Sequence, residues 1–294
     1  MGLDYRLRTH KHIERNIILA ALKDYIGSGE DEYQYVGFGA EYFKDFIMIH
    51  EQLNINNMVS IERNSNDRKR YEFNRPYNCI KILFGEAKDK LASLTFKEKM
   101  IIWLDFTDIF SENILEELFL ILNNIKLKTI VLFTFNIERP LSEEDYIRAF
   151  DRYKPLDYTK KYNAPLNYAG LVRKTMDNLM GSVLDSKYGK EFWATFFDFT
   201  YKDNAKMQTI GIVLDQPKEI ESFKLTSNSS FLFNSYNLAI ETLTPLELIY
   251  LKHLMPKGQD ELIPWCNTKD KSDRLIKQFK DVYKYYPLFG ETIS

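Results

Sequence analysis

The stretch Tyr35–Val36–Gly37–Phe38–Gly39–Ala40–Glu41 separates a short apolar run from a segment with helical spacing. The apolar run, residues 34–38, predicts a strand that ends at glycine, and residues 42–53 carry apolar side chains at the spacing of a helix. Glycines between a strand and a helix let the backbone approach a ligand closely, because no Cβ intervenes. A single G-x-G pair is also typical of an ordinary tight turn, so neighbouring segments must decide between the two interpretations.

Short apolar runs alternate with helical patterns on both sides of this stretch. Alternation of this kind predicts a parallel sheet covered by helices on both faces, with ligands at the carboxyl ends of its strands. The predicted helices span 10–26, 42–53 and 112–124, and the predicted strands span 34–38, 58–61, 79–84, 100–104 and 129–135.

The pattern changes after Asn136, where a charged, proline-containing segment begins. We expect a helix over 166–184, two strands over 192–201 and 207–214 around a turn at 202–205, a helix begun by Thr244–Pro245–Leu246–Glu247, and a final helix over 272–285. These elements predict one domain over 1–294. Its parts are an N-terminal helix or lid (1–30), a nucleotide-binding half (31–136), a helical insertion (137–190), completion of the sheet (191–240) and C-terminal helices (241–294).

The composition excludes several classes of protein. With two cysteines, Cys79 and Cys266, among 294 residues, the chain cannot form a disulfide scaffold or a four-cysteine zinc site, and it fits the reducing cytoplasm. No apolar run approaches the roughly 20 residues that span a bilayer, and no secretory signal is visible, so we expect no membrane partner. A net charge of -2 argues against a nonspecific polyanion coat but leaves a local nucleic-acid site open.

Polar residues follow the predicted strands where a nucleotide would lie. Glu62 stands 25 positions after Gly37, a distance typical of an acid that accepts hydrogen bonds from two ribose hydroxyls. Gly85–Glu86 follows the third strand, where a carboxylate can accept a hydrogen bond from an adenine amino group. Asp105 follows the fourth strand and can hold a ligand's amino group. Taken singly, each has a simpler interpretation. Glu62 also fits a surface acid paired with Arg63, Gly85–Glu86 a plain loop, and Asp105 a helix N-cap.

The order of these motifs resembles that of the class I S-adenosylmethionine-dependent methyltransferases. The segments Val59–Glu62, Phe73–Tyr77, Ile102–Asp105 and Ala205–Met207 are similar to those of bacterial proteins labelled putative O-methyltransferases. The resemblance implies a Rossmann-like, mostly parallel seven-stranded sheet with a late antiparallel strand pair. It also implies S-adenosylmethionine as cofactor and S-adenosylhomocysteine as product. The cofactor-binding residues that it implies are Tyr35, Gly37, Phe38, Gly39, Glu41, Glu62, Arg63, Gly85, Glu86, Asp105 and Phe106.

Two positions depart from the family pattern. Tyr35 replaces the acid that normally precedes the glycine loop, and Ala40 replaces its third glycine. Glu41 and Asp105 are the candidates to take over the missing acid's role. The departure at Tyr35 motivates an alternative hypothesis, a non-catalytic nucleotide-binding sensor or assembly subunit.

The residues after the fourth strand favour oxygen as the methyl acceptor. Asp105–Phe106–Thr107–Asp108 lacks the paired prolines of base-amino methyltransferases, and neither cysteine follows a proline, as the cytosine-C5 enzymes require. Asp105 and Asp108 are therefore the expected catalytic residues, with Asp105 as base or orienting group. Asp105, Asp108 and Asn136 make only part of a magnesium site, so we expect no resident metal and keep magnesium as the alternative.

Other segments predict partners less specifically. Arg8, Lys11 and Arg15 suggest a cationic lid over the cofactor. The basic run Arg63–Arg75 and the aromatic tail Tyr283–Phe289 suit either nucleic acid or ordinary surface and packing roles. The acceptor itself is not identified. As protein partners we expect either a second copy of the chain, in a homodimer, or a partner in a bacterial phage-defence complex.

Overall fold

The computed structural model describes residues 9–27, 32–156, 158, 168–202, 205–227, 229–238, 243–257 and 262–287. Their centre is one sheet of eight strands in the order β3-β2-β1-β4-β5-β7-β6-β8. β7 runs antiparallel to β5 and β6, and the other neighbours are parallel. The strands are β1 (Gln34–Gly37), β2 (Asn57–Glu62), β3 (Ile80–Phe84), β4 (Met100–Ile109), β5 (Thr129–Asn136), β6 (Trp193–Lys202), β7 (Lys206–Leu214) and β8 (Ser235–Leu238).

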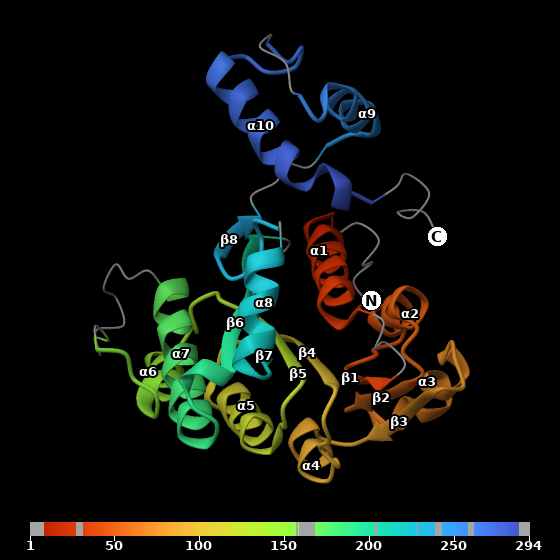
Figure 1. The fold of residues 1–294 in the computed structure, drawn as a ribbon, viewed down its shortest axis with the longest axis vertical. Helices are drawn as coiled ribbons and strands as arrows, with labels where there is room; N and C mark the ends of the chain where they lie inside the picture. The colour runs from red at the N-terminus through yellow and green to blue at the C-terminus, as the bar shows by residue number, and fades with distance from the viewer. Residues whose placement is uncertain are drawn as a thin grey trace.

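Helices cover both faces of the sheet, as the alternating pattern predicts (Figure 1). One hydrophobic core joins the sheet to α1, α2, α8 and the C-terminal helices, and the other joins it to α4, α5, α6 and α7. The helices are α1 (Thr9–Ile26), α2 (Lys44–Leu53), α3 (Arg68–Asn74), α4 (Ala87–Ala92), α5 (Glu112–Asn124), α6 (Glu143–Asp151), α7 (Tyr168–Lys187), α8 (Pro217–Thr226), α9 (Pro245–Leu254) and α10 (Lys269–Val282).

Local chemistry explains several element ends. Thr244 and Glu247 form the complete capping box that starts α9, with Pro245 in the first turn. Gly27 follows α1 with a φ of +58°, a conformation that favours glycine. α5 has the predicted bounds, because its apolar residues recur on one face.

The predicted count of seven strands is wrong, because β8 adds an eighth at the edge beside β6. Of its four residues only Leu238 is buried, so the segment has no apolar alternation to reveal it. β4 continues five residues past its predicted end at Leu104, through a register irregularity between Asp105 and Ile109. The predicted turn at 202–205 includes residues outside the described ranges.

The sheet's carboxyl edge gathers chain ends from both halves of the molecule. β1, β2, β4, β5, β6 and β8 all end there, and β7 begins there, since Asn136 and Tyr201 both pair with Met207. In Figure 1, α1 lies beside the sheet, and α9 and α10 stand beyond it. Among the described helices, none is both long and apolar enough to cross a membrane.

Candidate functional site

Glu62, at the end of β2, binds the glycine loop that follows β1. Its Oε1 accepts hydrogen bonds from the backbone N–H of Gly39 at 2.8 Å and from the hydroxyl of Ser60 at 2.6 Å. Burial raises the pKa of Glu62, and the hydrogen bonds from Ser60, Gly39 and Ala40 lower it in part. The predicted ribose acid is therefore a buried carboxylate that shapes the loop.

The glycine loop is tightly packed against its own protein. A Cβ on Gly39 would lie 2.6 Å from the Phe43 ring and from Ser60 Oγ. Ala40 has a φ of +48°, so the position where the family's third glycine falls keeps a conformation that glycine favours. Tyr35, where the family has an acid, is buried edge-on against Phe46 with ring centroids 4.8 Å apart. Burial raises its pKa well above the ordinary value, so Tyr35 contributes a neutral ring here.

Asp105, at the end of the regular part of β4, binds two cationic side chains of α1. Its Oδ2 accepts from Lys11 Nζ at 2.6 Å and from Arg15 Nη2 at 3.1 Å. Arg15 also forms a two-point contact with Asp45 of α2. Burial by itself raises the pKa of Asp105, but the charges and hydrogen bonds of Lys11 and Arg15 outweigh it and hold the pKa below the ordinary value. The other oxygen, Oδ1, is buried and has no hydrogen-bond partner in the described part of the chain.

A second acid of α1 extends this cluster of charges. Glu14 is fully buried and accepts a hydrogen bond from the Thr209 hydroxyl of β7. Thr209 in turn shares a hydrogen bond of 2.8 Å with Thr134 of β5. Burial raises the pKa of Glu14 to about 7, against the lowering effects of Thr209, Arg15 and Lys11. α1 is therefore held to the sheet by polar contacts as well as by its apolar face.

The predicted adenine-binding end is open and charged. Gly85 has a φ of +141°, in a region that glycine favours, and donates its N–H to the carbonyl of Glu62 at 2.9 Å. Glu86 forms an exposed ion pair with Arg63 at 3.1 Å. Burial, with the nearby charge of Glu86, raises the pKa of Glu117 to about 7.

The remaining predicted site residues lie outside the charge cluster of Asp105, Lys11 and Arg15. Phe38 and Phe106 meet edge to face with centroids 5.4 Å apart. Glu41 forms an ion pair with Arg70 of α3 at 2.8 Å. Asp108 is exposed on the irregular end of β4, and its charge contributes to the raised pKa of Glu117.

Asp105, Asp108 and Asn136, which could form part of a magnesium site, do not form one in the structure. Asp105 carries Lys11 and Arg15, and Asn136 Oδ1 accepts from the N–H of Glu138 at 2.7 Å. Across the described ranges, no group of three or more His, Cys, Asp or Glu side chains is arranged to hold a metal ion.

Sequence reasoning missed the roles of Asp45, Glu14 and Ser60. Lys11, Glu14 and Arg15 are spaced three and four residues apart, the spacing that places side chains on one face of a helix. That face also carries Ile17 and Ile18, both buried. Charged residues within an otherwise apolar helix face were the available signal for a buried polar cluster.

The residues at the ends of β1, β2 and β4 fit S-adenosylmethionine. Asp105 Oδ1 is a buried acceptor suited to an ammonium group, and Glu62 is a carboxylate suited to ribose hydroxyls. Gly37 and Gly39 end and follow β1, which lies between β2 and β4 in the sheet. The fit rests on these donor and acceptor types at the sheet's carboxyl edge.

Solved structures similar to this chain share little sequence with it. One is the O-methyltransferase TomG from Streptomyces achromogenes, in complex with S-adenosylmethionine. It is 12% identical, with 70% of this chain and 80% of that chain covered and a TM-score of 0.42. Another, from Klebsiella pneumoniae, is described as a putative O-methyltransferase. It is also 12% identical, with 74% and 92% covered and a TM-score of 0.40.

A search of curated proteins finds no match to this chain. The sequence model of one family, described as "Putative O-methyltransferase", matches residues 3–294. This match spans nearly the whole chain and includes each predicted site residue. The chain belongs to this O-methyltransferase family.

Proposed function

We propose that the protein transfers the methyl group of S-adenosylmethionine to an oxygen atom of its acceptor. Family membership supports the reaction class. The observation that carries the cofactor assignment is the buried Asp105 carboxylate, whose Oδ2 is held by Lys11 and Arg15 and whose Oδ1 has no partner in the described residues. A carboxylate held in this way presents a fixed acceptor to a ligand's ammonium group.

Each acid has a role that follows from its surroundings. Asp105 stays ionised at neutral pH, because the two cations hold its pKa below the ordinary value. We therefore assign it to holding the methionine ammonium group rather than to accepting a proton. Glu62 accepts hydrogen bonds from the ribose hydroxyls, at the end of β2 beside the glycine loop.

Bound S-adenosylmethionine supplies a methyl group on a positively charged sulfur. When bound, it would give this methyl group to the acceptor oxygen and leave as S-adenosylhomocysteine, and the acceptor's hydroxyl proton would pass to a base. The protein's own contribution is to position the two reactants in line. Asp108 is the candidate base, because it is exposed beyond the end of the regular pairing of β4 and makes no hydrogen bond or ion pair with the described residues.

The test is calorimetric titration of S-adenosylhomocysteine into wild type, Glu62→Gln and Asp105→Asn. We expect each variant to bind about 10- to 100-fold more weakly, because each loses a hydrogen bond to a charged group, worth about 1.5–3 kcal/mol. Glu221→Gln, on the exposed face of α8, is the matched control and should bind as wild type does. Absence of binding by folded wild type would refute the proposal.

Transfer is tested separately, with radiolabelled S-adenosylmethionine and a cell extract as the source of acceptor. We expect labelled product with wild type and at least ten-fold less with Asp108→Asn, whose cofactor affinity should be unchanged. Binding without transfer to any extract component would favour the sensor or assembly subunit instead.

We further propose a bacterial cytoplasmic location. Both cysteines are free thiols, which supports a reducing compartment. A role in phage defence is the accompanying hypothesis. Genes for nucleases or reverse transcriptases beside this one would support it.

A further inference from the structure

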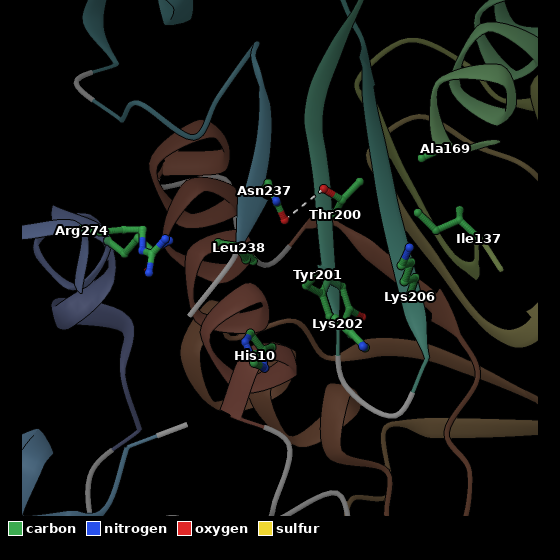
Figure 2. A pocket seen from close by; sticks show the side chains of 11 residues that line it. His10, Ile137, Ala169, Thr200, Tyr201, Lys202, Lys206, Asn237, Leu238 and Arg274 are labelled. Carbon is green, nitrogen blue, oxygen red and sulfur yellow. Dashed lines mark hydrogen bonds between the residues drawn. The ribbon is translucent and has the colours of Figure 1, made fainter. Parts of the chain in front are cut away.

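A cavity of about 630 Å³ lies at the carboxyl edge of the sheet, at the ends of the strands from β5 to β8. Its lining includes Ile137, which follows β5, Lys202 at the end of β6, Lys206 at the start of β7 and Leu238 at the end of β8. Figure 2 shows these side chains on several elements that are far apart in the sequence. The volume is in the range typical of small-molecule sites.

The described lining of this cavity carries exposed cations and no acid, and Asp203, which follows Lys202, lies outside the described residues. Lys202, Lys206 and Arg274 line it, and no Asp or Glu is found among its described lining residues. None of these three cations has an ion-pair partner in the part of the chain that the structure describes. This contrasts with Lys11 and Arg15, which are neutralised by Asp105 and Asp45. Three cations without a carboxylate partner favour an anionic ligand over a neutral one.

Neutral groups complete the lining. The Thr200 hydroxyl donates to Asn237 Oδ1 at 3.4 Å, as the dashed line in Figure 2 shows. Ile137, Ala169 and Leu238 add apolar surface. A ligand with an anionic group and a small body that carries both hydroxyl and apolar parts matches this combination.

Two pairs of chain neighbours relate the cavity to the proposed cofactor site. His10 lines the cavity, and the next residue, Lys11, binds Asp105. Ile137 follows Asn136, which pairs with Ile109 of β4 just beyond Asp105 and Asp108. The cavity therefore opens at the same sheet edge from which an acceptor must reach the methyl group.

We propose that this cavity binds the methyl acceptor, and that the acceptor is a small molecule with a phosphate or carboxylate group held by Lys202, Lys206 and Arg274. The inference rests on the proposed function, since it names the substrate class for the same site. Arg274 comes from α10, so the C-terminal helices contribute to acceptor recognition. Its planar guanidinium suits an anion with two oxygens.

The first experiment measures anion binding without cofactor. Inorganic pyrophosphate is titrated into the full-length protein and followed by its phosphorus NMR signal, with citrate as the carboxylate probe in a parallel calorimetric titration. We expect millimolar or tighter binding of at least one probe, and at least ten-fold weaker binding to the triple variant Lys202→Gln, Lys206→Gln, Arg274→Gln. Whichever probe binds more tightly identifies the anion as phosphate or carboxylate.

Lys218→Gln is the matched control, because its side chain is 88% exposed on α8 and does not line the cavity. The control should bind both probes as wild type does. Equal affinity of wild type and the triple variant, or no binding of either probe to wild type at 10 mM, would overturn the proposal. So would a 20-nucleotide single strand that binds more tightly than both probes and depends on the same three residues, because it would assign the surface to nucleic acid.

The second measurement separates this proposal from the proposed function. The triple variant should bind S-adenosylhomocysteine with wild-type affinity and keep a wild-type melting temperature. Loss of anion binding with cofactor binding intact supports the acceptor site. Loss of S-adenosylhomocysteine affinity in the triple variant would assign these cations to the cofactor and overturn the proposal. Failure of wild type to bind S-adenosylhomocysteine would instead refute the proposed function.

Discussion

Asp105→Asn tests whether the charge cluster on α1 stabilises the fold as well as the site. Lys11 Nζ lies 2.6 Å from Asp105, and the two side chains are only 4% and 13% exposed. Removing one partner of a buried ion pair costs about 3–5 kcal/mol. We take the lower limit, about 3 kcal/mol, because Arg15 keeps its contact with Asp45. Neutralising Asp105 leaves Lys11 and Arg15 facing each other without the anion between them.

The expected shift in melting temperature follows from chain length. An unfolding entropy of about 2.1 cal/mol/K per residue makes 3 kcal/mol equivalent to roughly 5 °C for 294 residues. Differential scanning calorimetry and urea unfolding both measure this loss. Glu116→Gln is the matched control, since Lys88 and Glu116 form a pair at the same 2.6 Å with side chains 57% and 38% exposed. Breaking the exposed pair should leave the melting temperature nearly unchanged.

The pH dependence provides a second check on Asp105. Its pKa in the folded protein is below the ordinary value of 3.8, so its stabilising effect is complete above that value and is lost as pH falls through the folded pKa. The difference between wild type and Asp105→Asn should therefore shrink below pH 4. A melting temperature of Asp105→Asn within 1 °C of wild type at pH 7 would refute the reasoning.

Three further predictions use the same unfolding measurements. Because the pKa of Glu14 rises to about 7 on folding, the wild type should lose about 3 kcal/mol more stability between pH 5 and pH 8 than Glu14→Gln loses; parallel curves would contradict it. Gly39→Ala should lower the free energy of unfolding by about 1–3 kcal/mol, because its Cβ would meet the Phe43 ring. In the control Gly181→Ala in α7, the Cβ meets only Asp185 Oδ2 at 3.7 Å, so this variant should be more stable by about 0.5–1 kcal/mol. Ala40→Gly should leave stability unchanged or raise it, because the φ of +48° offsets the usual cost of glycine; a loss above 1 kcal/mol would refute this.

Apolar patterning was sufficient to predict most of the sheet. β5 is buried at all eight positions, so its run of apolar and β-branched residues is continuous and its bounds were nearly correct. β8 was missed, because an edge strand with one buried residue has no such pattern. Short helices such as α3 were missed for the same reason, since none of its residues is buried.

The candidate site, too, could be predicted from the sequence only in part. Glu62 and Asp105 could be predicted, because each directly follows a recognisable strand at a fixed place in the chain order. The contact of Asp105 with Lys11 and Arg15 could not, because it joins residues 94 and 90 positions apart. Contacts at that separation depend on how α1 packs against the sheet, which no local pattern contains.

The sequence by itself determined the alternation of strands and helices, the parallel sheet, and the acids at the ends of β2 and β4, because each depends on local spacing and burial. Only the tertiary structure decided the ionisation of those acids, since the pKa of a carboxylate depends on the charges that packing brings beside it. It holds Asp105 ionised between two cations and raises the pKa of Glu14 to about 7. The tertiary structure also brought Lys202, Lys206 and Arg274 to one cavity, because β6, β7 and α10 meet only in the folded chain.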